Sequence, residues 1–325
     1  MCNRLSLSLT LILIALAVGL GTNASGQTVQ PISDYVVRGF SFNPAIAGLS
    51  NALSIQLNGV QQLAAMKGSP YSGSFLIHSP VYNTQMAIGG GVMMDRFGPT
   101  TNLNAFINYS HLVKISDYKL LSLGLRASVN NYRVNFNEIS LENQSDPLFA
   151  SNIDGAMKSN FGVGAHFYTS DFFLSASMPS VLSSTIYSDT KGAFSENKCP
   201  LYFSTGYYFD FSKALSIRPS LLTRKIKGEQ TLTDFSLQVF YGSIFSAGLS
   251  YRVKNALVFL LGADLGQSWQ LSYAYDYPTG SLSNLRVGRH ELTLQYNYHY
   301  DWRRSSRYIL KTKKKKESLK SLRYF

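Results

Sequence analysis

The chain carries the stretch RHELTLQYNYHYDW at residues 289–302, in which Leu, Tyr and Trp alternate with polar side chains. Successive side chains of a β-strand point to opposite faces, so this stretch predicts a strand with one apolar, aromatic face and one polar face. It exceeds the roughly 9–11 residues that a tilted strand needs to cross a bilayer. Its aromatic residues gather toward one end, as they do where a membrane barrel meets the interface. A soluble antiparallel sheet can also alternate, but these two features favour a strand of a transmembrane β-barrel.

Most of the chain between residues 51 and 302 repeats this alternation. The clearest second example is Leu121–Asn130, where Leu, Ala and Val face one way and Arg126 falls on the polar side. An arginine is costly against lipid but is compatible with a wet lumen. Bacterial barrels prefer even strand numbers, so the pattern predicts a single-chain antiparallel barrel of about 14 strands with a polar lumen. An array of soluble secreted β-sandwiches is the competing interpretation.

The first 26 residues have the organisation of a secretory signal peptide. Arg4 supplies the positive charge, residues 9–20 are apolar, and Ala24-Ser25-Gly26 is a suitable cleavage site. A membrane-anchoring helix is the weaker alternative, because the apolar core is short. Export combined with the barrel pattern predicts a protein of the bacterial outer membrane.

Three segments interrupt the strand pattern. Residues 27–50 form an N-terminal lead that contains FNPAIAG at residues 42–48, which predicts a turn or plug-like loop rather than a strand or helix. Residues 143–159 are polar and contain Asp-Pro, and residues 179–200 also lack alternation. We interpret these two stretches as long loops on the extracellular side.

The net charge of +12 is concentrated in the segment 303–325, which holds ten Lys or Arg against one Glu. The rest of the mature chain is close to neutral. Five lysines are candidate contacts for a partner or for lipid: Lys311, Lys313, Lys314, Lys315 and Lys316. Nucleic acid is an improbable partner for an exported protein, whereas anionic headgroups, an acidic periplasmic partner, or only water all fit such a tail.

The sequence offers no catalytic, cofactor-binding or metal-binding constellation. The five histidines are scattered and lack metal-ligand spacing. His290 and Glu291 are adjacent, but a strand places them on opposite faces, which argues against a paired site. We therefore expect no enzyme activity, cofactor or metal.

Several short motifs lie in order along nearly the whole mature chain. We take the following residues as their structural positions: Phe42, Asn43, Pro44, Gly48, Gly68, Pro70, Asp95, Gly98, Asp146, Pro147, Tyr275, Asp276, Tyr277, His290 and Glu291. Each motif alone is weak, but in number and order they specifically resemble the PorP/SprF family of the type IX secretion and gliding machinery of Bacteroidetes.

This resemblance implies a non-enzymatic outer-membrane barrel that supports secretion or surface attachment of cargo bearing a type IX sorting domain, such as a large adhesin. Its implied partners are that cargo, periplasmic components of the secretion system and outer-membrane lipid. An alternative from another class is a diffusion channel for small or apolar solutes. A third is a structural barrel that ties the membrane to the cell wall through the basic tail.

Overall fold

The computed structural model describes residues 31–62, 69–135, 153–188, 192–197, 199–212, 214–242, 244–266, 268–279 and 288–299. Within these ranges the chain is almost entirely β-strand, and it contains no helix long and apolar enough to span a membrane. The elements are α2 (Gly39–Phe42), η1 (Pro44–Ile46), β1 (Ala52–Gln62), β2 (Tyr71–Pro80), β3 (Met86–Phe97), β4 (Thr100–Ser116), β5 (Lys119–Val134), β6 (Ile153–Tyr168), β7 (Phe172–Met178), β8 (Ser184–Ser188), β9 (Gly192–Asn197), β10 (Leu201–Tyr207), β11 (Phe209–Asp210), β12 (Leu215–Lys225), β13 (Leu232–Tyr241), β14 (Phe245–Arg252), β15 (Ala256–Leu265), β16 (Trp269–Pro278) and β17 (Arg289–His299).

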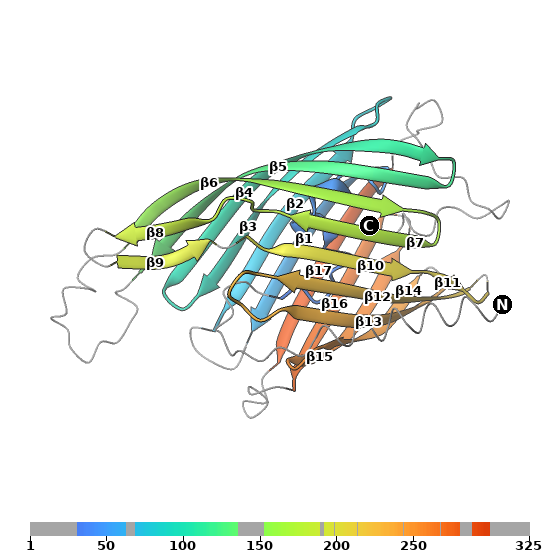
Figure 1. Cartoon of the computed structure of the whole chain (residues 1–325). Helices are drawn as coiled ribbons and strands as arrows, with labels where there is room; N and C mark the ends of the chain where they lie inside the picture. Colours follow the sequence, from blue (N-terminus) through green and yellow to red (C-terminus); the bar gives the residue numbers. More distant parts are fainter. Residues whose placement is uncertain are drawn as a thin grey trace.

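The described strands close into an antiparallel barrel of 14 staves, as the alternation predicts. From β1 to β7 and from β12 to β17 each strand pairs with the next one along the chain, β1 pairs with β17, and β10 pairs with both β7 and β12. The two-residue strand β11 continues the line of β10, and β8 and β9 form a separate hairpin that projects from one end of the barrel (Figure 1).

The predicted division into an apolar and a polar face is confirmed on the strands that suggested it. On β17, Leu292 is 52% exposed on the outside, whereas Glu291 and Thr293 are each 1% exposed on the inside. On β5, Leu123 and Leu125 are exposed and Arg126 is buried. The outer wall is thus apolar and the inner wall is polar, the arrangement of a barrel that crosses a membrane.

The connections differ in length at the two ends of the barrel. At the end where β1 begins and β17 finishes, the described turns are short, for example residues 117–118 and 169–171. The opposite end carries the long connections after β5, β7 and β16. Outer-membrane barrels have short periplasmic turns and longer extracellular loops, so the first end is periplasmic.

Exposed aromatic side chains gather at the periplasmic end, as expected for an interfacial girdle. They include Tyr82, Tyr118, Phe209, Phe211, Tyr241, Phe245, Trp269 and Tyr298. The aromatic end of the 289–302 stretch, as far as it is described, belongs to this girdle: Trp269 and Tyr296 lie with ring centroids 4.7 Å apart.

Both loop predictions are wrong in part. Strand β6 begins at Ile153, inside the stretch 143–159 that we expected to be a loop, and Lys158 pairs with Asn130 of β5. The residue after this stretch, Asn160, faces the lumen and is 2% exposed, so the polar residues here belong to the inward side of a strand. The stretch 179–200 contains the β8–β9 hairpin.

Candidate functional site: a plugged lumen

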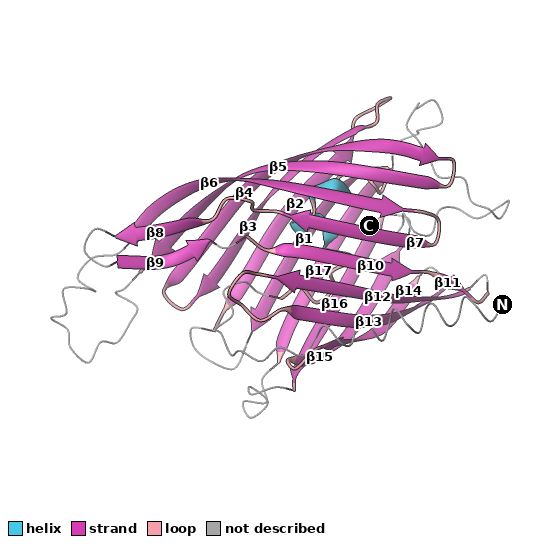
Figure 2. Ribbon diagram, viewed as in Figure 1, coloured by secondary structure: helices cyan, strands magenta, loops and turns pink. Residues whose placement is uncertain are grey.

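The segment Pro31–Ser50 runs through the lumen of the barrel, and Figure 2 shows its helical turn inside the ring of strands. Its side chains Tyr35, Phe40, Phe42, Ile46 and Leu49 are among the most buried apolar groups of the described chain. We call residues 31–50 the plug. Apolar plug side chains and apolar side chains of the wall form one buried cluster, which explains why apolar groups occur in a polar lumen. The cluster joins Tyr35, Phe40 and Phe42 of the plug to Phe106, Phe173, Tyr202 and Phe240 of the wall.

Serine hydroxyls of the wall satisfy backbone carbonyls of the plug. The bonds are Ser177 Oγ to Phe42 O (3.0 Å), Ser122 Oγ to Ala45 O (2.6 Å) and Ser110 Oγ to Ala47 O (2.9 Å). A buried carbonyl without a partner is costly, so each hydroxyl fixes the plug at one point of the wall. The small polar residues on the inward rows of the strands therefore act as docking groups.

Asn43 is the centre of the FNPAIAG motif. Its Oδ1 accepts from Ala45 N at 2.9 Å, which caps the 3-10 turn Pro44–Ile46, and its Nδ2 donates to Ser175 Oγ at 2.6 Å. Proline at the first position of the turn is favourable, because its missing N–H would have no partner there. The expectation that this motif avoids helical structure is thus wrong at Phe42, the last residue of α2, and over Pro44–Ile46.

The last residue of the motif turns the chain toward β1. Gly48 has a φ of +70°, a conformation that glycine adopts without strain, and its N–H donates to His78 Nδ1 at 3.1 Å. His78 also packs against Phe40 with ring centroids 4.6 Å apart. The family-motif glycine is therefore required by the backbone at the exit of the plug.

Arg126 faces the lumen as predicted, but plug atoms surround it instead of water. Its guanidinium donates to Ser41 O (2.8 Å), Phe40 O (3.0 Å) and Asn108 Oδ1 (2.9 Å). It also lies 3.9 Å from the ring centroid of Phe106, a cation–π arrangement. Phe106, which interrupts the polar face of β4, thus packs against both Arg126 and the plug.

An ion-pair network of three arginines and three carboxylates lies on the extracellular side of the plug. Its pairs are Arg38–Glu291 (3.0 Å), Arg289–Glu291 (2.8 Å), Arg289–Asp276 (3.2 Å), Arg252–Asp276 (2.7 Å) and Arg252–Asp234 (2.8 Å). All six residues are at most 7% exposed. Buried charges need such pairing, and the equal numbers leave the network neutral.

The plug enters this network directly. Arg38 supplies one of the three guanidinium groups, Ser33 Oγ donates to Asp276 Oδ1 at 2.6 Å, and Arg289 donates to Pro31 O at 2.7 Å. The network therefore ties the beginning of the plug to β16 and β17 while it joins β13 and β14 to the same group. The network thus connects strands of the wall to one another and also connects the wall to the plug.

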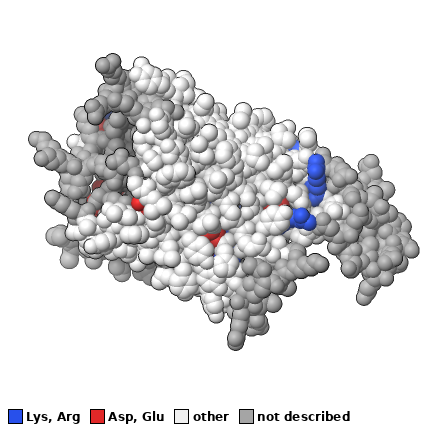
Figure 3. Space-filling model, turned by 180° about the vertical axis from the view of Figure 1, so that it is seen from behind, with Lys and Arg blue, Asp and Glu red and all other residues white. Residues whose placement is uncertain are grey.

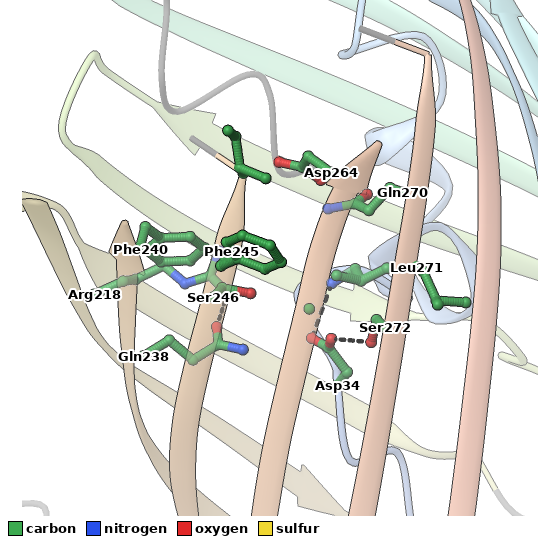
Figure 4. Close-up of a pocket in the computed structure, with 13 residues that line it drawn as sticks. Asp34, Arg218, Gln238, Phe240, Phe245, Ser246, Asp264, Gln270, Leu271 and Ser272 are labelled. Atoms are coloured by element: carbon green, nitrogen blue, oxygen red, sulfur yellow. Dashed lines mark hydrogen bonds between the residues drawn. The ribbon is translucent and has the colours of Figure 1, made fainter. Parts of the chain in front are cut away.

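Asp34 follows Ser33 in the plug. Its carboxylate points away from the ion-pair network, toward the periplasmic half of the lumen (Figure 4). Ser272 Oγ donates to its carboxylate at 2.5 Å, and Arg218, which donates to Gln238 and Tyr208, lies nearby. Burial raises the pKa of Asp34 above its usual range, although the Ser272 hydroxyl and the Arg218 charge oppose this shift. The adjoining cavity of about 10 Å³ is about the size of one water molecule.

Of the family-motif positions, the structure brings Asp276 and Glu291 together in the network and Phe42, Asn43, Pro44 and Gly48 together in the plug. Asp95 faces the lumen and accepts from Ser72 Oγ at 2.6 Å, Pro70 O accepts from Gln62 N, and Gly98 occupies the β3–β4 turn with a φ of +52°. Gly68, Asp146, Pro147, Lys311, Lys313, Lys314, Lys315 and Lys316 lie outside the described residues.

Tyr275, Tyr277 and His290 lie on the outer wall instead. His290 Nδ1 lies 2.7 Å from Tyr273 Oη and its ring lies 5.0 Å from that of Tyr275. His290 and Glu291 thus occupy opposite faces, as the strand period requires. The two residues are adjacent in sequence but do not form a shared site.

Sequence reasoning missed Arg38, Asp234, Arg252 and Arg289. The signal that drew attention to Arg126 was also present for Asp234, Arg252 and Arg289, because each is a charged residue on the inward row of an alternating strand. Among the described residues, no three His, Cys, Asp or Glu side chains gather as metal ligands. What the described lumen offers is a network of fixed contacts to the plug.

A family model for the type IX secretion system membrane protein PorP/SprF matches residues 24–296. Solved structures with a similar fold include the CymD monoaromatic hydrocarbon channel (11% identity, TM-score 0.48, 87% of this chain and 97% of that chain). A Pseudomonas aeruginosa FadL homologue is 12% identical with a TM-score of 0.47, over 79% of this chain and 92% of that chain. The Pseudomonas putida toluene transporter TodX is 9% identical with a TM-score of 0.47, over 84% and 95% of the two chains. No curated protein sequence matches the chain.

Proposed function

Because the chain belongs to the PorP/SprF family of type IX secretion membrane proteins, we propose that it supports the secretion or surface attachment of cargo bearing a type IX sorting domain. The chain is an outer-membrane component of this system. The family match, which spans the plug and the described barrel strands as far as residue 296, is the observation that carries the proposal. The proposed role is non-catalytic.

The plugged lumen supports a scaffold in preference to an open pore. The wall contacts the plug through the ion-pair network at its start, Arg126 at its centre and His78 at its exit. A diffusion channel would require these contacts to break for each passage. In the proposed arrangement, the cargo binds the extracellular end of the barrel, where the connections after β5 and β7 emerge.

The proposal predicts a specific loss from the cell surface when the gene is deleted. Surface and released proteins of the deletion strain and the parent should be compared by quantitative mass spectrometry. We expect loss of one or a few proteins that carry type IX sorting domains, and restoration by the intact gene. Loss of every such protein would assign a general role in the machine instead, and an unchanged surface would reject the proposal.

The basic segment 304–325 follows β17, whose end lies at the periplasmic end of the barrel with the short turns. We propose that it binds an acidic periplasmic component of the secretion system. Deleting residues 304–325 should leave barrel assembly unchanged and reduce co-purification of that component, whereas replacing the five lysines by arginine should preserve it because the charge is kept. Unchanged co-purification after the deletion would reject this role for the tail.

A further inference from the structure

The outer wall of the barrel has an apolar hollow of about 770 Å³ over strands β1–β6. Outward-facing side chains line it, with Ile107 70% exposed, Phe161 60% exposed and Leu125 59% exposed. The hollow follows two neighbouring rows across the sheet. One row contains Gly90, Ile107, Ala127 and Phe161, and the other contains Ile88, Tyr109 and Leu125. A closed barrel is convex on average, so a hollow across several strands requires a local cause.

Three consecutive glycines of β3 provide that cause. Gly89 and Gly91 face the lumen, where a Cβ atom would lie 2.7 Å from Phe40 of the plug and 2.5 Å from Leu76 respectively. The backbone of β3 thus approaches its inner neighbours more closely than a side chain would allow. Gly90 faces outward and adds no side chain to the floor. The close packing of β3 against Phe40 and Leu76, together with the missing side chain at Gly90, accounts for the hollow on the outer side.

The lining of the hollow favours an apolar ligand. His78, Asn108 and Arg126 contribute to its floor. In the lumen, His78 Nδ1 accepts from Gly48 N, Asn108 Oδ1 accepts from Arg126, and Arg126 also donates to the plug. The remaining lining is aliphatic or aromatic except for the glycines and the hydroxyl groups of Ser79 and Tyr109, and the Tyr109 hydroxyl lies 3.3 Å from His111 Nδ1. Figure 3, which shows the back of the molecule, has few charged atoms among the described residues of the outer wall.

The outer wall of an outer-membrane barrel faces hydrocarbon. A hollow in it must therefore be filled, because otherwise the side chains that line it lose dispersion contacts. Strands of such barrels tilt by about 35–45°, so a row that runs across them is inclined to the membrane plane. A chain that enters from one leaflet can follow such a row. We propose that the hollow binds one acyl chain of an outer-membrane phospholipid. This inference depends on the membrane location alone and goes beyond the proposed role in secretion.

The test uses the full-length protein in vesicles that contain phosphatidylethanolamine with a photoreactive diazirine on one acyl chain. After illumination, mass spectrometry locates the labelled peptides. We expect the label to be concentrated on β3–β5 relative to the opposite wall, β13–β15. Equal labelling of the two walls would overturn the proposal, since lipid would then contact the barrel without a preferred site.

Variants that fill the hollow sharpen the test. Ala127→Phe places a ring between Ile107 and Phe161, and Ala247→Phe places the same ring on the exposed outer face of β14, away from the hollow. Labelling of β3–β5 should be lost in Ala127→Phe and retained in Ala247→Phe. Leu125→Trp serves as a second filling variant, and the heat-modifiable electrophoretic shift checks folding. Wild-type labelling in both folded filling variants would overturn the proposal.

Discussion

Replacing Glu291 by alanine should cause the largest loss of stability of any single substitution in the barrel wall. Its carboxylate is 1% exposed and accepts from Arg38, from Arg289 and from the backbone N–H of Ser33. Removal leaves Arg38 buried without its counter-ion and takes one carboxylate from Arg289. Breaking one partner of a buried ion pair typically costs about 3–5 kcal/mol. The measurement is the urea midpoint for loss of the heat-modifiable folded band.

His290→Ala is the matched control, because the neighbouring side chain lies on the outer wall and is exposed. Substitutions at such positions usually change stability by about 0.5 kcal/mol or less. Glu291→Gln should fall between the two, since the amide keeps the shape and one acceptor but not the charge. Equal midpoints for Glu291→Ala and His290→Ala would show that the ion-pair network does not stabilise the barrel.

The same two residues show how far sequence reasoning reaches. A period of two is a local property, so the inward position of Glu291 and the outward position of His290 follow from the strand itself. The partners of Glu291 do not follow, because Arg38 lies 253 positions away and reaches it only through the path of the plug. Asp276 and Arg252 enter the same network through the registers of β14, β15 and β16, which no single stretch specifies.

The loop errors have a related origin. Lys158 and Asn160 belong to a strand whose inward side is polar, and polar composition is also the usual mark of a loop. In this barrel the polar side chains line the inside, so a polar stretch can belong to a strand and does not by itself indicate a loop. The plug is the other departure, because Arg126 was expected to need a wet lumen and instead binds the carbonyls of Phe40 and Ser41.

Substitution of Gly124 by alanine should displace the plug while leaving the barrel closed. Gly124 faces the lumen on β5, and a Cβ atom there would overlap the backbone of Pro44 and Ala45, with Ala45 Cα only 2.7 Å away. Backbone atoms held by Asn43 and Ser122 cannot move aside without losing hydrogen bonds. Overpacking of this kind typically costs about 1–3 kcal/mol, and because the strand is fixed on both sides by its ladder, the plug is the element that yields.

Gly59→Ala is the control, since Gly59 faces outward on β1 and a Cβ atom added there would have no neighbouring atom within 4 Å. In planar bilayers, wild type and Gly59→Ala should conduct little, and Gly124→Ala should conduct more and expose the plug to added protease. Surface display of the cargo should fall in parallel if secretion requires the seated plug. Unchanged conductance and unchanged protease sensitivity in Gly124→Ala would mean that FNPAIAG is not held as the contacts indicate, whereas high conductance in wild type would favour the channel function.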